Sequence, residues 1–138
     1  MSRQCCRKEV VTTDQAPKPI GPYSAAVKGG HFLFTAGQIG IDPQTGEMVP
    51  GGVEAETRQV MKNLHALLEA AGTSFERVVK TTIFLRDMND FTRVNAIYGE
   101  FFAGEPPARS TVQVAGLPKG AAVEIEVIAL LAEEDPCC

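Results

Sequence analysis

The body of this chain lacks cysteine: none occurs between Arg7 and Pro136, and the 138 residues include no tryptophan and only two histidines. The missing internal thiol excludes a catalytic cysteine inside the domain and a disulfide framework. Long apolar runs are also missing, because the longest, Val127–Ala132, falls far short of the roughly 20 residues that span a bilayer. A transmembrane helix is therefore excluded.

The chain also has fewer positively charged than negatively charged residues. Lysine and arginine number 13 against 17 aspartates and glutamates, which gives a formal net charge of −4. General binding of nucleic acid needs a surplus of lysine and arginine on some face, so the composition disfavours it. No apolar signal core lies within the first eight residues, and we expect a cytoplasmic protein.

All four cysteines lie near the ends of the chain, as the doublets Cys5-Cys6 and Cys137-Cys138. Four thiolates can hold zinc, but adjacent cysteines chelate one ion poorly, and zinc sites usually space them about two to four residues apart. We therefore expect tails and no metal site. The length fits one domain at residues 13–132, with a tail and a possible first strand at 1–12 and a second tail at 133–138.

Three segments in the first part of the chain have strand character: Glu9–Thr12, Tyr23–Lys28 and His31–Ala36. Between the last two, Gly29-Gly30 is typical of a two-residue hairpin turn. The prolines within Ala16–Pro22 exclude regular structure there, because proline fixes φ and removes a backbone donor.

Apolar residues then recur at spacings of three and four over Val53–Ala71, which predicts a helix. Gly72 follows in the position where glycine commonly ends helices. A second apolar stripe over Phe91–Phe102 predicts another helix, which Asn89 or Asp90 can cap.

Three further strands are predicted at Val78–Arg86, Thr111–Ala115 and Val123–Ala132. In the first of them, the alternation assigns to one face Val79, Thr81, Ile83 and Leu85. The chain thus runs through three strands, a helix, a strand, a helix and two strands. This order predicts an α+β domain in which a single sheet carries both helices on one face.

Conventional catalytic machinery is sparse. His31 follows the predicted hairpin turn and should be exposed, and His65 lies at the edge of the first helix's apolar stripe. Neither histidine has a partner at metal-ligand spacing. No serine lies in a Gly-x-Ser-x-Gly elbow, and Gly37–Gly40 lacks the third glycine and the following helix of a dinucleotide-binding loop.

Arg109 is the first candidate for chemistry. Pro106 and Pro107 hold the chain extended just before it, so this segment has less entropy to lose on binding. The planar guanidinium matches a carboxylate in bidentate geometry. The alternative is a surface arginine in a structural ion pair.

Glu124 and Glu126 are the second candidate. In a strand both point to one face, while Val123, Ile125 and Val127 point to the other. The glutamate face becomes apolar further along the strand, which favours partial burial of one carboxyl. A partly buried glutamate has a raised pKa and can transfer protons. The alternative is a solvated strand edge.

At these residues the sequence resembles the RidA family, also called YjgF, of reactive-intermediate deaminases. The resemblance extends from about Thr13 to Leu131. The matching segments are Ile20–Ser24, Gly37–Ile39, Val79–Thr82, Asn89–Phe91 with Val94-Asn95, Pro107–Ser110, and Leu117–Gly120 leading into Val123–Glu126. The Pro-Ala-Arg and Ile-Glu segments at this separation, with the Gly-Pro-Tyr loop upstream, form a specific combination.

The resemblance implies a chorismate-mutase-like (YjgF-like) fold and a homotrimer with active sites between its subunits. It implies hydrolytic deamination of reactive 2-imino acids or their enamine tautomers, among them 2-iminobutanoate and 2-iminopropanoate, to 2-keto acids and ammonia. Such intermediates damage other enzymes, so this activity limits metabolite damage. No cofactor is implied.

The family's functional residues carry over one at a time. By resemblance, Arg109 binds the substrate carboxylate and Glu124 handles water, and these two are the catalytic residues. Substrate contacts are implied for Tyr23, Gly37, Asn95, Arg109 and Thr111. Two positions depart from the family's pattern, because Ala36 stands where many members have serine and Pro106 where an aromatic residue is common.

Other functions remain open at this point. A module that binds small carboxylates without turnover would present the same cleft, and only a measurement of turnover separates it from an enzyme. RNA cleavage, translation inhibition and protein holdase activity are attributed to some members of the family. The acidic balance and the absence of tryptophan offer no evident platform for stacking RNA bases.

Overall fold

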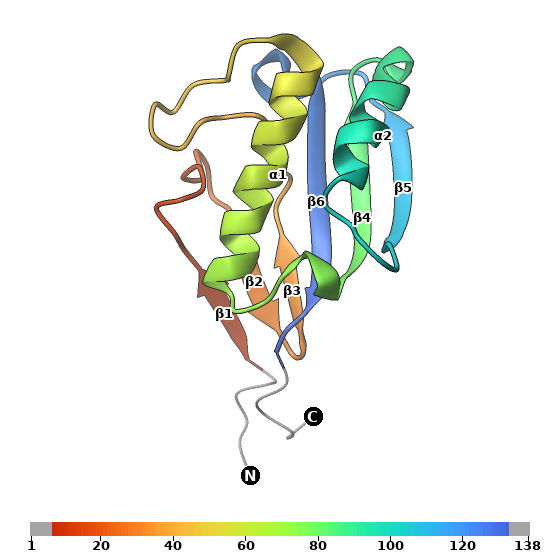
Figure 1. Ribbon diagram of the computed structural model, residues 1–138. Helices are drawn as coiled ribbons and strands as arrows, with labels where there is room; N and C mark the ends of the chain where they lie inside the picture. Colours follow the sequence, from red (N-terminus) through yellow and green to blue (C-terminus); the bar gives the residue numbers. More distant parts are fainter. Residues whose placement is uncertain (1–6, 133–138) are drawn as a thin grey trace.

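The computed structural model describes residues 7–132, which form one mixed sheet with two helices against one of its faces (Figure 1). The helices are α1 (Gly52–Ala70) and α2 (Phe91–Gly99). The strands are β1 (Lys8–Val11), β2 (Ala26–Gly29), β3 (Phe32–Thr35), β4 (Val78–Leu85), β5 (Ala108–Gln113) and β6 (Val123–Leu130). The predicted α+β class, the single sheet and the placement of both helices on one face are confirmed.

The six strands lie in the order β1-β2-β3-β6-β4-β5. Neighbouring strands are antiparallel except β4 and β5, which are parallel and joined through α2. A parallel pair needs such a crossover because a tight turn cannot bring the chain back to the same end of the sheet. In this strand order β6 lies inside the sheet, between β3 and β4, and β5 lies at one edge.

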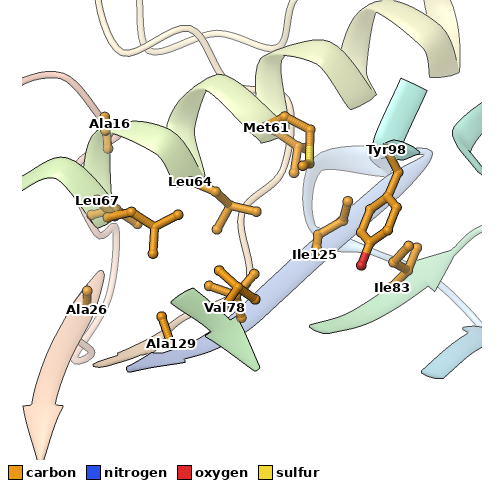
Figure 2. Packing of buried hydrophobic residues seen from close by; sticks show 14 of the residues in the cluster. Ala16, Ala26, Met61, Leu64, Leu67, Val78, Ile83, Tyr98, Ile125 and Ala129 are labelled. Atoms are coloured by element: carbon orange, nitrogen blue, oxygen red, sulfur yellow. The ribbon is translucent and has the colours of Figure 1, made fainter. Parts of the chain in front are cut away.

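The core lies between α1 and the sheet. Figure 2 shows Met61, Leu64 and Leu67 extending from α1 toward the strands, whose side chains Ile83 and Ile125 belong to the same buried cluster. All five side chains are at most 1% exposed. Removing this apolar surface from water stabilises the fold by about 25 cal/mol for each Å² buried, so the packing fixes α1 firmly over the sheet.

The predicted end of the first helix is confirmed. Gly72 has a φ of 81°, in the left-handed region that glycine adopts without strain, and its N–H donates to the carbonyl of Glu69. The second helix differs from the prediction. Asp87 caps a short 3-10 turn, η3 (Met88–Asp90), through its side chain, and α2 then ends at Gly99.

The strands also differ from the prediction in detail. β2 begins at Ala26, since Tyr23 belongs to a turn in which its N–H donates to the carbonyl of Gly21. The hairpin loop consists of Gly30 and His31, because Gly29 pairs with Phe32. β5 starts at Ala108 rather than at Thr111, because the parallel pairing with β4 already holds the chain there.

The alternation of β4 is interrupted at Val79. A register shift between Val78 and Lys80 inserts a bulge there, which leaves Val79 39% exposed instead of on the buried face. Thr81, Ile83 and Leu85 share one face as predicted, and that face is buried. The prediction that Val79 shares the face of Thr81, Ile83 and Leu85 is therefore wrong. Beyond the bulge the alternation of β4 is regular.

The face of the sheet opposite the helices, hereafter the open face, carries several exposed apolar side chains. Buried and exposed residues alternate along β3 and β6, so the side chains that do not contact α1 point to this face. Side chains between 36% and 48% exposed are contributed here by Val10, Phe32, Phe34, Val79, Val112 and Leu130. Patches of this kind mark interaction surfaces in soluble proteins.

Two predictions concern the chain ends and its relation to membranes. The four cysteines of the terminal doublets lie outside the described residues. Within residues 7–132, neither helix combines the length and apolarity needed to cross a membrane.

Candidate active site

Glu124 lies in a cavity at the open face. The alternation of β6 directs Val123 and Ile125 into the core and leaves Glu124 on the other side, half-buried. The cavity has a volume of about 290 Å³. Its walls combine Glu124 with Tyr23, Ala36, Gly37 and the apolar side chains of Ile20, Ile39, Ile41 and Pro118. Three of the predicted site residues, Tyr23, Gly37 and Glu124, thus meet in one place.

Gly37 lies directly against the carboxyl group of Glu124. A Cβ atom at position 37 would lie 2.0 Å from Oε2 of Glu124, a separation that real side chains do not reach. The next residue fixes this approach, because Gln38 exchanges two backbone hydrogen bonds with Ile125. The N–H of Gln38 donates over 2.9 Å and the N–H of Ile125 over 3.1 Å. Any side chain at position 37 would therefore displace the carboxyl group.

The surroundings of Glu124 raise its pKa. Burial in the cavity is the larger cause, and repulsion from Glu126 on the same strand face adds to it. A glutamate of this kind exchanges a proton more readily near neutral pH than an exposed one. The alternative of a solvated strand edge is wrong, since β6 is paired with β3 on one side and β4 on the other.

Arg109 lies in a second cluster, formed by β5 and α2. Its Nη1 donates to Oδ1 of Asn95 over 2.5 Å. The guanidinium also lies over the rings of Phe91 and Tyr98, 5.4 Å and 5.0 Å from their centroids. No ion pair within residues 7–132 includes Arg109, so the alternative of a structural ion pair fails there. The cluster holds the guanidinium in place without neutralising it.

Tyr98, one of the two rings under the guanidinium of Arg109, is itself held by a hydrogen bond to the sheet. Its hydroxyl shares a buried hydrogen bond of 2.8 Å with Oγ1 of Thr81 on β4. Burial raises the pKa of Tyr98, against smaller opposing effects from Thr81 and Arg109, so the phenol stays neutral. Sequence reasoning placed Phe91 and Tyr98 in the core stripe and missed their contact with Arg109. The available signal was the spacing of Phe91, Asn95 and Tyr98, which puts them on one helix face.

Thr111 follows Arg109 by two residues on β5, so both side chains point to the same side of the strand. Its Oγ1 is buried and has no hydrogen-bond partner among the described residues. A buried hydroxyl without a partner typically costs about 1–3 kcal/mol. Thr111 is therefore the one polar side chain of the second cluster that is left unsatisfied in the described part of the chain.

The two clusters lie on opposite faces of the sheet. Arg109 is level with Thr81, whose side chain points to the helices, whereas Glu124 is level with Phe84 on the open face. The strand β4 separates β5 from β6, which adds about 10 Å sideways. A small substrate therefore cannot touch Arg109 and Glu124 of the same protomer.

The histidines take no part in either cluster. His65 is exposed, stacks on Phe75 and lies 4.0 Å from Glu69. His31, predicted to be exposed, is partly buried at the hairpin. In the part of the chain that the structure describes, no three histidine, cysteine, aspartate or glutamate side chains gather closely enough to hold a metal ion.

Comparisons with known proteins agree with this architecture. A protein of Mus musculus named 2-iminobutanoate/2-iminopropanoate deaminase is 52% identical over 123 residues, which cover 89% of this chain and 91% of the mouse protein. The crystal structure of YyfA, a conserved Rid family protein from Yersinia pestis, superimposes with a TM-score of 0.89 at 51% identity and covers 91% of this chain and 100% of its own. The structure of E. coli TdcF with bound serine has a TM-score of 0.85 at 43% identity, over 88% and 98% of the two chains.

A family model provides the broadest comparison. The model described as Endoribonuclease L-PSP matches residues 13–131, a span that contains every residue of both clusters. The names within this group differ, since the model is called an endoribonuclease and the mouse relative a deaminase. The chain belongs to this endoribonuclease L-PSP family, also known as the RidA or YjgF family.

Proposed function

We propose that this protein hydrolyses reactive 2-imino acids and their enamine tautomers, including 2-iminobutanoate and 2-iminopropanoate, to 2-keto acids and ammonia. The observation that supports this most directly is Glu124, a half-buried carboxyl with a raised pKa pressed against Gly37 in an apolar cavity. Arg109 supplies a rigid, charged fork for a carboxylate. The name of the mouse relative and the amino acid bound to TdcF point to the same class of ligand.

The mechanism follows from these groups. Arg109 holds the substrate carboxylate and so places the adjacent imine carbon, which is already electrophilic. Water adds to the carbon of the protonated imine while Glu124 takes a proton from the water, and a neutral tetrahedral carbinolamine forms. Glu124 then returns the proton to the nitrogen, the C–N bond breaks and ammonia leaves. The remaining hydroxyl gives its proton to the ionised Glu124, and from there to solvent, as the C=O bond of the keto acid forms, so one water is consumed for each ammonia released.

A complete site requires a second copy of the chain. We infer that the Arg109 cluster at the β5 edge of one protomer faces the Glu124 cavity on the open face of a neighbour. These surfaces differ, so the contact is heterologous, and copies joined in this way form a ring where the rotation between neighbours closes. A ring of three agrees with the resemblance noted in the sequence. The exposed apolar side chains of the open face would then be covered.

Turnover of an imine is the first prediction. An amino acid oxidase or a dehydratase generates 2-iminobutanoate in situ, and semicarbazide traps it as it forms. The protein should divert the intermediate to 2-oxobutanoate and lower the semicarbazone signal in proportion to its concentration. An unchanged semicarbazone signal together with measurable binding of 2-oxobutanoate would instead identify a carboxylate-binding module.

Assembly is the second prediction. The wild-type protein should scatter light as a trimer at micromolar concentration. Phe34→Glu places a charge on the open face, where Phe34 is 45% exposed, and should yield inactive monomers with an unchanged circular dichroism spectrum. Lys62→Glu, a charge change on an exposed position of α1, should leave the trimer intact. A fully active wild-type monomer would contradict the shared site.

Arg109 provides the third prediction. Arg109→Lys keeps the charge but loses the fork, and kcat/KM for the imine should fall about 10- to 100-fold; Arg109→Ala should fall further. The matched control is Arg58→Lys, because Arg58 makes a bidentate contact with Glu100 on the surface. The control should retain wild-type kinetics. Full activity of Arg109→Lys would mean that charge alone attracts the substrate.

Glu124 provides the fourth prediction. Glu124→Gln keeps the shape but cannot accept a proton, so kcat should fall about 10²- to 10⁴-fold while 2-oxobutanoate still binds. In the wild type, Glu124 must be ionised to act as a base, so kcat should be lost as the pH falls through its raised pKa. Glu126→Gln removes the repulsion and should move this acid limb to lower pH with most of kcat retained. Equal, small losses in both variants would assign water activation elsewhere.

A further inference from the structure

Two buried polar side chains on α1 have no part in the mechanism above. Glu56 is 8% exposed and Asn63 is 0% exposed, although both lie on the face of the helix that packs into the protein. They are seven residues apart, which is about two helical turns, so they share one stripe. Burying a carboxyl and an amide is unfavourable unless each is hydrogen-bonded, so their contacts should reveal what they do.

Asn63 holds the loop that follows Gly37. Its Nδ2 donates to the carbonyl of Ile41 over 2.9 Å and to the carbonyl of Ile39 over 3.2 Å. Its Oδ1 accepts from Nε2 of Gln59 over 2.9 Å, which fixes the orientation of the amide. Ile39 and Ile41 both line the cavity that contains Glu124. One side chain therefore ties the part of the cavity wall formed by Ile39 and Ile41 to α1, beside which the loop runs (Figure 1).

Glu56 holds the start of β6, the strand that carries Glu124 on the other side of the cavity. Its Oε1 accepts from the backbone N–H of Ala122 over 2.8 Å, just before β6 begins and two residues before Glu124. The loop also fits closely against this part of the helix, because a Cβ atom at Gly40 would lie 2.9 Å from Cα of Glu56. The two walls that approach each other at Gly37 and Glu124 are thus fastened separately to the same helix.

We propose that Glu56 and Asn63 are positioning residues that set the separation between the Gly37 segment and the carboxyl group of Glu124. This inference rests on the proposed function. Apolar side chains could fill the same space, but only directional hydrogen bonds fix where the loop carbonyls and the β6 amide lie. Gly37 lies so close to the carboxyl group of Glu124 that even a Cβ atom does not fit between them. A displacement of about 1 Å at a reacting group can reduce a rate about 10²-fold.

Asn63→Leu tests the first of the two anchors. The variant keeps the size of the side chain and removes both donors. We expect kcat for imine hydrolysis to fall about 10- to 100-fold, while the dissociation constant of 2-oxobutanoate, which is held by Arg109, changes less than about threefold. If Asn63→Leu does not fold, Asn63→Ser takes its place, since a hydroxyl can restore at most one of the two bonds.

The matched control is Thr57→Val. Thr57 is also 0% exposed on α1, but its hydroxyl donates to the carbonyl of Val53 within the helix, over 2.7 Å. This variant loses a buried hydrogen bond without releasing either wall, so kcat should remain within about twofold of wild type. An equal loss of kcat in Thr57→Val and Asn63→Leu would reduce Asn63 to a residue that only stabilises the fold and would overturn the proposal.

Glu56 offers a rescue experiment. Glu56→Gln retains an oxygen that can accept from Ala122, whereas Glu56→Leu does not. Near wild-type kcat in Glu56→Gln, with a loss of at least about tenfold in Glu56→Leu, supports the anchor. Equal activity of the two variants contradicts it.

A readout independent of turnover separates this proposal from the proposed function. In amide NMR spectra, Asn63→Leu should shift the signals of Gly37 and Gln38 and speed their hydrogen exchange, and Thr57→Val should not. If the wild type does not hydrolyse imines but these shifts occur, the function is wrong and the anchoring role stands. If the wild type is active but the Gly37 amide does not respond, the anchoring role is wrong.

Discussion

The approach of Gly37 to the carboxyl group of Glu124 is the constraint on which the site depends. It requires a residue without a side chain at position 37 and a strand that directs Glu124 to the open face. It also requires the pair of backbone hydrogen bonds that holds Gln38 to Ile125. Burial at this place raises the pKa of Glu124, and repulsion from Glu126 adds to the effect.

Local periodicity predicted only part of this site, and the resemblance to the family supplied Tyr23, Gly37, Asn95 and Thr111. The alternation of β6 has a period of two residues, so it assigned Glu124 and Glu126 to one face before any tertiary contact was considered. The prolines before Arg109 likewise identified a stiff approach to the sheet. What periodicity could not provide was the pairing partner of each strand, and hence the finding that Arg109 and Glu124 lie on opposite faces.

The failures of prediction have tertiary causes. The apolar stripe of the second helix continues to Phe102, yet α2 ends at Gly99, and Phe101 and Phe102 pack on Phe75 from the segment that follows the helix. Val79 fits a regular strand until the bulge beside it shifts the register against β6. The sequence also did not predict that the rings of Phe91 and Tyr98 lie under Arg109. Aromatic residues on the apolar stripe of a helix usually belong to the core.

The division of the clusters between two faces has a consequence for how activity is controlled. Under the proposed function, Arg109 binds the carboxylate and Glu124 transfers protons, but β4 keeps these two groups of one protomer apart. Under the proposed arrangement they meet only when protomers associate, so the same burial of apolar surface that stabilises the ring also completes the chemistry. Selection for assembly and selection for catalysis would then act on the same surface. This accounts for an open face that combines exposed phenylalanines with a half-buried glutamate, a mixture that neither a simple interface nor a solvated sheet would favour.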